Sequence, residues 1–131
     1  MCLHVKWDNP EHTIIQHSVE AIHWTVDDLR LAFLETWEMM QTVDHTVGVI
    51  FDVRGGHDVP AGFLALSRWV AMHRPANAGW IVIVGGSPRM QAMYDVFRCT
   101  YTIFNHDFKL LFVDTLPEAR HIFVDQPVVN I

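Results

Sequence analysis

Three nearly continuous apolar runs constrain the fold of this chain more than any other feature of its sequence. They cover residues 47–53, 80–84 and 109–113, and the first two are rich in β-branched residues. Such runs are typical of strands that are covered on both faces in a parallel sheet. Apolar residues at helical intervals fill the two segments between them, from 62 to 73 (Phe63, Leu66, Trp69, Val70) and from Ser87-Pro88 onward (Met90, Met93, Tyr94, Phe97). This alternation predicts an α/β domain in which helices join parallel strands.

The N-terminal part predicts an antiparallel hairpin followed by a helix. Residues 3–7 and 13–19 have the pattern of short strands, and the Asn9-Pro10 pair between them favours a turn. Thr25 has Asp28 three residues later, a variant of the capping box, and opens a predicted helix over residues 26–43.

The C-terminal part predicts one more helix. Thr115 and Glu118 form a second capping box, and the helix that they open should run through Phe123. Residues 125–131 carry no assignment. The whole chain, residues 1–131, is therefore predicted to be one domain with a central mixed, mainly parallel β-sheet, an N-terminal hairpin and about four α-helices.

Composition and charge exclude several classes of function. The chain has 131 residues, half of them apolar, which is enough to build one core without metal or disulfide support. Its formal net charge is -6 and its nine basic residues lie singly, which disfavours nucleic acid as a partner.

No apolar run approaches the roughly 20 residues that a membrane span needs, so no membrane insertion is expected. The start lacks a signal-peptide pattern, and the two cysteines form no spaced motif, so a cytoplasmic location is expected. The nine histidines are scattered, which favours solvated surface positions.

Three segments resemble parts of the STAS domain, the fold of sulfate transporter tails and anti-sigma-factor antagonists. The strand, Gly-rich loop and helix start of residues 47–62 resemble the core of that family. Residues 81–89, IVIVGGSPR, look like its fourth strand and the turn into its third helix, and residues 112–120, FVDTLPEAR, look like its final strand and helix. The resemblance runs from the first strand to Phe123 and implies a STAS-like fold.

The resemblance also implies what this chain lacks. Switch members of the family carry Asp-Ser-Ser/Thr-Gly where this chain reads Val59-Pro60-Ala61-Gly62. Their phosphorylated position, just before the glycine, is Ala61 here, and Ser67 lies too far into the next helix to replace it. The sequence therefore predicts a non-enzymatic protein-interaction or regulatory module without the phosphoswitch. Its protein partner stays unidentified.

The first candidate site is the loop after the strand of residues 47–53. Its position at the carboxyl end of a parallel strand is where open α/β sheets place ligands, and in the STAS family this edge docks a kinase or another partner. The candidate docking residues are Arg54, Gly55, Gly56, His57, Asp58, Val59 and Pro60. A structural interpretation stands beside this one: the two glycines permit a tight loop and Asp58 caps the next helix.

The second candidate site is the turn Gly85, Gly86, Ser87 and Arg89 before the next helix. Free backbone N–H groups, the hydroxyl and the guanidinium there could hold a carboxylate or phosphate. The alternative function is accordingly a small-molecule (anion) binding protein, or a minor hydrolase, that uses both loops. A deep pocket between the loops would favour this alternative over docking. The turn lacks a P-loop lysine, and Ser-Pro is also ordinary capping chemistry.

The remaining residues predict no catalytic set, no metal site and no cofactor. Cys99 and His106 lack a third group that would orient them for thiol chemistry. A metal site across the hairpin would need His17 beside His4 or His12, together with a carboxylate.

The tryptophans and methionines leave a homodimer open as a further expectation. We expect Trp37, Trp69, Met40 and Met93 in the core and the other three tryptophans at the edges of elements; Met39 and Met90 fit a core or an interface equally well. Exposed aromatic residues and a free edge strand would both favour self-association.

Overall fold

The computed structural model describes residues 3–19, 24–54, 61–101 and 110–125. They form a βαβ-rich domain with five strands and four helices among the described residues. In chain order these are β1 (Leu3–Trp7), β2 (Ile14–Val19), α1 (Val26–Met40), β3 (Val47–Asp52), α2 (Phe63–His73), β4 (Ala78–Val84), α3 (Pro88–Tyr101), β5 (Leu110–Val113) and α4 (Leu116–Asp125).

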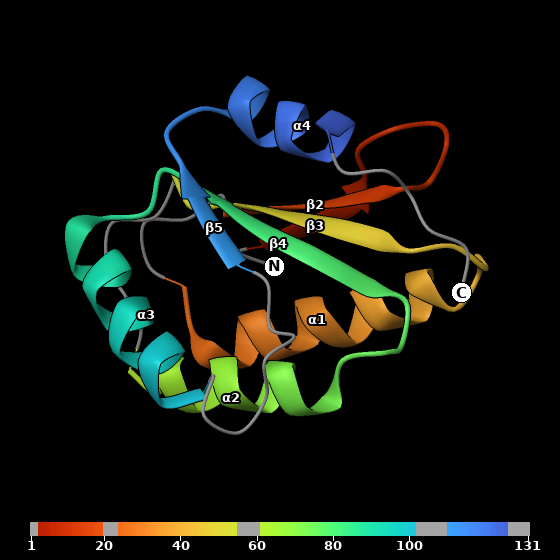
Figure 1. The fold of residues 1–131 in the computed structure, drawn as a ribbon. Coiled ribbons are helices and arrows are strands. Elements are labelled where there is room, and N and C mark those ends of the chain that lie inside the picture. The colour runs from red at the N-terminus through yellow and green to blue at the C-terminus, as the bar shows by residue number, and fades with distance from the viewer. Residues whose placement is uncertain (1–2, 20–23, 55–60, 102–109, 126–131) are drawn as a thin grey trace.

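The sheet keeps the strands in chain order, β1-β2-β3-β4-β5. The first pair is antiparallel, with Val5 opposite His17, and the remaining pairs are parallel. Because right-handed crossovers that step in one direction across a sheet place their helices on one face, α1, α2 and α3 share a face. Helix α4 covers the other face (Figure 1). The predicted α/β fold with a mainly parallel sheet and an N-terminal hairpin is confirmed.

A side-chain turn closes the hairpin. Asn9 Oδ1 accepts hydrogen bonds from the backbone N–H groups of Thr13 and Ile14, and Asn9 Nδ2 donates to Thr13 Oγ1 at 2.6 Å. The His12 ring stacks on Trp7 at 4.3 Å between centroids. Strand β2 therefore begins at Ile14, one residue later than predicted.

Helix α1 begins as predicted and ends earlier. Thr25 Oγ1 accepts from the Asp28 N–H, and Asp28 Oδ2 accepts from the Thr25 N–H, which completes the capping box. The helix ends at Met40, three residues before the predicted end, where Asn77 Nδ2 donates to the Met40 carbonyl at 2.8 Å. This cap comes from a residue far along the chain, so local sequence could not show it.

Two apolar layers flank the sheet. The larger lies under α1, α2 and α3 and includes Phe51, Phe63 and Leu66; the smaller lies under α4 and includes Ile50, Val82 and Ala119. Gly48 faces α4: a methyl group added there would collide with the Phe123 ring. The sheet thus approaches α4 closely at this glycine.

The tryptophans divide between the core and its margin. Trp24 lies at an element edge, directly before the N-cap of α1, and is 5 % exposed because its ring packs edge-on against Phe51 and Phe63. Trp37 and Trp69 are only half-buried, since their rings meet in the seam between α1 and α2, 5.0 Å apart.

The methionines divide in a similar way. Met40 and Met90 are buried, whereas Met39 and Met93 are half-buried. Met93 was expected in the core and is not fully enclosed there. In the described part of the chain, no helix is long and apolar enough to cross a membrane.

Candidate functional site

The candidate site lies at the edge of the sheet where the parallel strands end. Strand β3 ends at Asp52 and β4 at Val84, and hydrogen bonds continue the ladder past both ends. The Val53 N–H donates to the Val84 carbonyl, and the Gly85 N–H donates to the Val113 carbonyl. The two turns that the sequence singled out are thereby held next to each other.

An ion pair fixes the first residue of the β3 loop. Arg54 Nε and Nη2 donate to the two carboxylate oxygens of Asp52 at 2.9 and 2.8 Å, and the Arg54 N–H also donates to Asp52 Oδ1. Burial raises the pKa of the Asp52 carboxyl, but the hydrogen bonds and charge of Arg54 outweigh it and hold the pKa below its usual value. The guanidinium charge of Arg54 is thus balanced by the last residue of β3.

Arg54 also joins the two candidate turns. Its aliphatic stem lies against Gly85, whose φ of 74° is in the left-handed region, so that a methyl group at position 85 would collide with Arg54 Cγ. Glycine at position 85 is therefore required both by the backbone turn and by the side chain that covers it.

The polar groups of the second turn are used in capping. Ser87 Oγ accepts from the Met90 N–H at 3.2 Å, and the Gly86 carbonyl accepts from Gln91 Nε2 at 3.0 Å. Arg89 is exposed and forms no ion pair with the described residues. The interpretation of Ser87-Pro88 as a helix cap is therefore confirmed. The guanidinium of Arg89 is the charged group of this turn that faces solvent.

The N-cap of α2 is a glycine. Gly62 has φ 82° and has no side chain that could accept a hydrogen bond from the first turn. The N-cap position therefore belongs to Gly62 and not to Asp58, since the helix begins at Phe63, five residues after Asp58. Gly55, Gly56, His57, Asp58, Val59 and Pro60 lie outside the described residues. Ala61 and Gly62 are exposed, so the position before the glycine faces solvent and bears only a methyl group.

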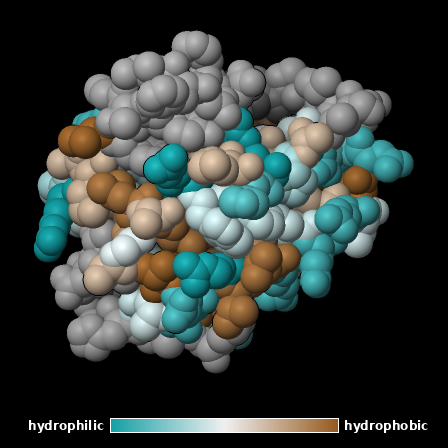
Figure 2. Space-filling model, turned by 90° about the horizontal axis from the view of Figure 1, so that it is seen from below, coloured by the Kyte–Doolittle hydropathy of each residue, from teal (hydrophilic) through white to brown (hydrophobic). Residues whose placement is uncertain are grey.

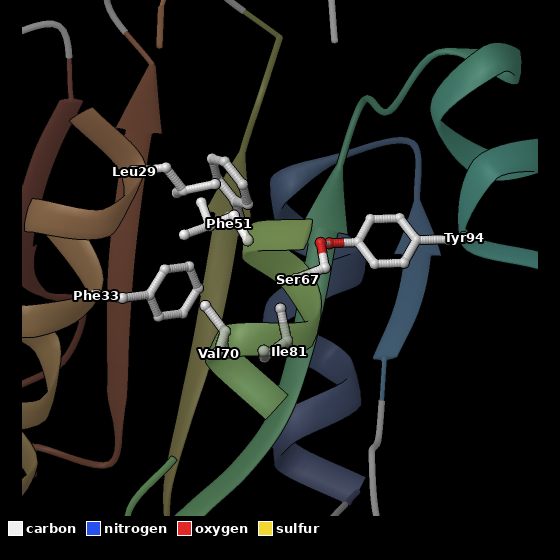
Figure 3. Close-up of a pocket in the computed structure, with 8 residues that line it drawn as sticks. Leu29, Phe33, Phe51, Ser67, Val70, Ile81 and Tyr94 are labelled. Atoms are coloured by element: carbon white, nitrogen blue, oxygen red, sulfur yellow. Dashed lines mark hydrogen bonds between the residues drawn. The ribbon is translucent and has the colours of Figure 1, made fainter. Parts of the chain in front are cut away.

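The serine of α2 is sealed in the core. Ser67 is 5 % exposed and donates to the Phe63 carbonyl at 2.9 Å, and its Oγ also lies 2.9 Å from the Tyr94 hydroxyl (Figure 3). Burial, partly offset by the hydrogen bond with Ser67, raises the pKa of Tyr94 to about 12. The phenol is accordingly neutral at physiological pH, and neither hydroxyl is placed for chemistry with a dissolved substrate.

Ser67 and Tyr94 line a small internal cavity of about 10 Å³ between the sheet and the helices. Leu29 and Phe33 reach it from α1, and Phe51 reaches it from β3 (Figure 3). A neighbouring cavity of about 20 Å³ shares the Phe33 wall. Each has room for about one water molecule, and neither adjoins Arg54 or Ser87, so these cavities are not the pocket that the ligand interpretation requires.

Sequence reasoning missed a buried histidine. His17 is fully buried between Phe33 and Phe51, and its Nε2 lies 2.5 Å from Thr36 Oγ1. Because the Thr36 hydroxyl donates to the Ala32 carbonyl, His17 Nε2–H is the donor to Thr36, and Nδ1 has no hydrogen-bond partner among the described residues. Burial lowers the pKa of His17 from 6.5 to about 3, so the ring is neutral. The expectation of a surface position is wrong for this histidine.

The hairpin does not assemble the histidine metal site. His17 points into the core, His12 stacks on Trp7, and His4 pairs with Ser18, so its side chain lies on the other face of the strand from that of His17. Within the described ranges, no group of three or more potential ligands could hold a metal ion. His106 lies outside the described residues, as does the side chain of Cys99.

Together these residues define an α/β domain whose strand-end edge is built from an internal ion pair, a glycine contact and a helix cap. No protein-family model matches the chain, and no curated protein matches it significantly.

Proposed function

We propose that this chain is a non-enzymatic protein-interaction or regulatory module of the STAS-like type that acts without a phosphoswitch. Its docking surface is the strand-end edge that carries Arg54 and the start of α2. The observation that supports this most directly is at that helix start: Ala61 and Gly62 are exposed and bear no hydroxyl, while Ser67 is enclosed in the core.

The bonding of the edge supports docking over anion binding. An anion site needs donors that are free to turn toward the ligand. Arg54 is already bidentate with Asp52, and the Ser87 hydroxyl is oriented by the Met90 N–H that it accepts. Among the described residues of the two turns, Arg89 is the charged donor that is left without an ion pair. A protein partner can instead contact such internally bonded groups as a preformed surface, because their orientation is fixed before binding.

The test is native mass spectrometry of the protein purified gently from its own host, with Arg54→Gln beside the wild type. We expect a stoichiometric protein partner that the variant retains less well. Lys6→Gln is the matched control. Lys6 is exposed on the edge strand β1, so this substitution also removes one positive charge, but at a distance from the proposed docking surface. A retained small anion on an otherwise lone chain would contradict docking and favour the ligand site, with Arg89→Gln as the next variant.

A further inference from the structure

The outer face of α1 combines exposed leucines with carboxylates. Asp27, Leu31, Leu34, Glu35 and Glu38 recur at the spacing of one helical face, opposite the buried residues of the helix. Leu31 is 54 % exposed and Leu34 is 42 % exposed, so two apolar side chains three residues apart on this face meet solvent. Figure 2 views the molecule from the side of α1–α3, where brown apolar residues lie beside teal hydrophilic ones.

The carboxylates of this face are not balanced within the described structure. Glu35 and Glu38 are exposed and form no ion pair with the described residues. The one basic residue of α1, Arg30, is already bound to Asp27 at 2.7 Å and lies over the Trp69 ring. The C-terminal half of this face is therefore left with uncompensated negative charge.

The placement of these charges works against the helix itself. Glu35 and Glu38 are three residues apart, a spacing at which like charges repel. Glu38 also lies in the last turn, where the helix dipole disfavours negative charge, and that turn has no basic residue. A positively charged partner would relieve both unfavourable terms, whereas solvent alone only screens them.

From this we propose that the outer face of α1, made of Leu31, Leu34, Glu35 and Glu38, docks a basic amphipathic segment of a partner protein. Apolar residues of that segment cover the two leucines, and its lysines or arginines face Glu35 and Glu38. A second copy of this chain is a poor occupant, because a twofold contact would bring each acidic face against its own copy. This surface is separate from the Arg54 edge, so the inference does not depend on the proposed function.

The probe for this surface is a synthetic 18-residue peptide of leucine and lysine with helical amphipathic spacing. It is titrated into the isotope-labelled full chain, and the backbone amide signals are followed by NMR. Two control peptides are a scrambled peptide of the same composition and an amphipathic peptide with glutamate in place of lysine. We expect amide shifts centred on residues 31–38, weaker at higher salt, and little response to either control.

Matched variants separate the two parts of the surface. Glu35→Gln with Glu38→Gln should weaken peptide binding roughly two- to ten-fold, since exposed charge contacts are individually small. The control pair Glu11→Gln with Asp95→Asn removes the same charge from exposed positions elsewhere and should leave binding unchanged. Leu31→Ser with Leu34→Ser should abolish the shifts, while Val96→Ser with Val124→Ser, also exposed, should not.

Three results would overturn the proposal. The first is a peptide response spread over other elements or absent from α1. The second is equal binding of the scrambled or acidic peptide, or equal loss in the control variants. The third is a shift of α1 signals with protein concentration alone, which would make a second copy the occupant. Arg54→Gln should leave peptide binding intact, so failure here and failure of edge docking are distinguishable.

Discussion

The side chain of Arg54 occupies the space that Gly85 leaves open, which locks the β3 loop against the turn after β4. We expect Gly85→Ala to lower the free energy of unfolding by roughly 1–3 kcal/mol from the left-handed backbone alone, with a further loss from the collision with Arg54. In an Arg54→Ala background only the backbone cost remains. Urea denaturation of the four proteins measures the coupling, and an equal cost in both backgrounds would show that the contact is unimportant.

The buried His17 should make stability depend on pH. Its folded-state pKa, about 3, lies below the unfolded value of 6.5, so protonation favours the unfolded chain. Its contribution to stability is complete above pH 6.5 and is lost as the pH falls toward 3; since one pKa unit is worth about 1.4 kcal/mol, the loss reaches several kcal/mol.

The test compares His17→Leu with the wild type by denaturation at several pH values. The variant should lose less stability between pH 6.5 and 3, because it has no buried imidazole to protonate. Carboxylates titrate in both proteins at the acid end of this range. The effect of His17 is therefore read from the difference between the two curves of stability against pH. Parallel curves would mean that His17 is protonated without unfolding.

The ion pair between Asp8 and Arg120 should hold α4 to the hairpin. Asp8 has a side-chain exposure of 4 %, and both its oxygens accept from Arg120, at 2.9 and 3.0 Å. Arg120→Ala leaves that carboxylate enclosed without its partner and should cost roughly 1–3 kcal/mol, less than a fully buried pair because Arg120 is half exposed.

A matched variant tests whether burial is the cause. Arg30→Ala removes the exposed pair with Asp27, whose side chains are 45 % and 84 % exposed, and should cost at most about 1 kcal/mol. Adding Asp8→Asn to Arg120→Ala should recover part of the loss, since the lone charge disappears. Equal effects of Arg120→Ala and Arg30→Ala in thermal denaturation would argue against this account.

An aspartate should be tolerated at position 61, just before α2, and should destabilise the protein at position 67, inside the helix. Ser67→Asp places a charge in the core beside Tyr94 and should cost more than about 3 kcal/mol. Ala61→Asp lies in solvent near a helix N-terminus and should change stability by less than about 1 kcal/mol. Circular dichroism melting compares them, with Ser67→Ala as a control that loses one hydrogen bond, worth about 1 kcal/mol. A well-folded Ser67→Asp protein would reopen this serine as a regulatory position.

The order of elements was predictable because it depends on local patterns. Continuous apolar runs indicated β3 and β4, and Thr25 with Asp28 located the start of α1. The ends were less predictable: α1 ends where Asn77 caps Met40 from 37 residues away. The candidate edge followed from the rule that parallel strands end together, but the sequence could not show that Arg54 is neutralised by Asp52 and covers Gly85.

By itself the sequence determined which segments form strands and helices, because hydrophobic periodicity and capping act over a few residues. It also determined that Ala61 precedes Gly62, where the resembled family carries a hydroxyl. Only the tertiary structure decided the fate of single polar side chains such as His17 and Ser67. The local sequence around each of these two residues is compatible with an exposed or a buried position. Whether the side chain contacts water or a buried partner depends on which distant element packs over it.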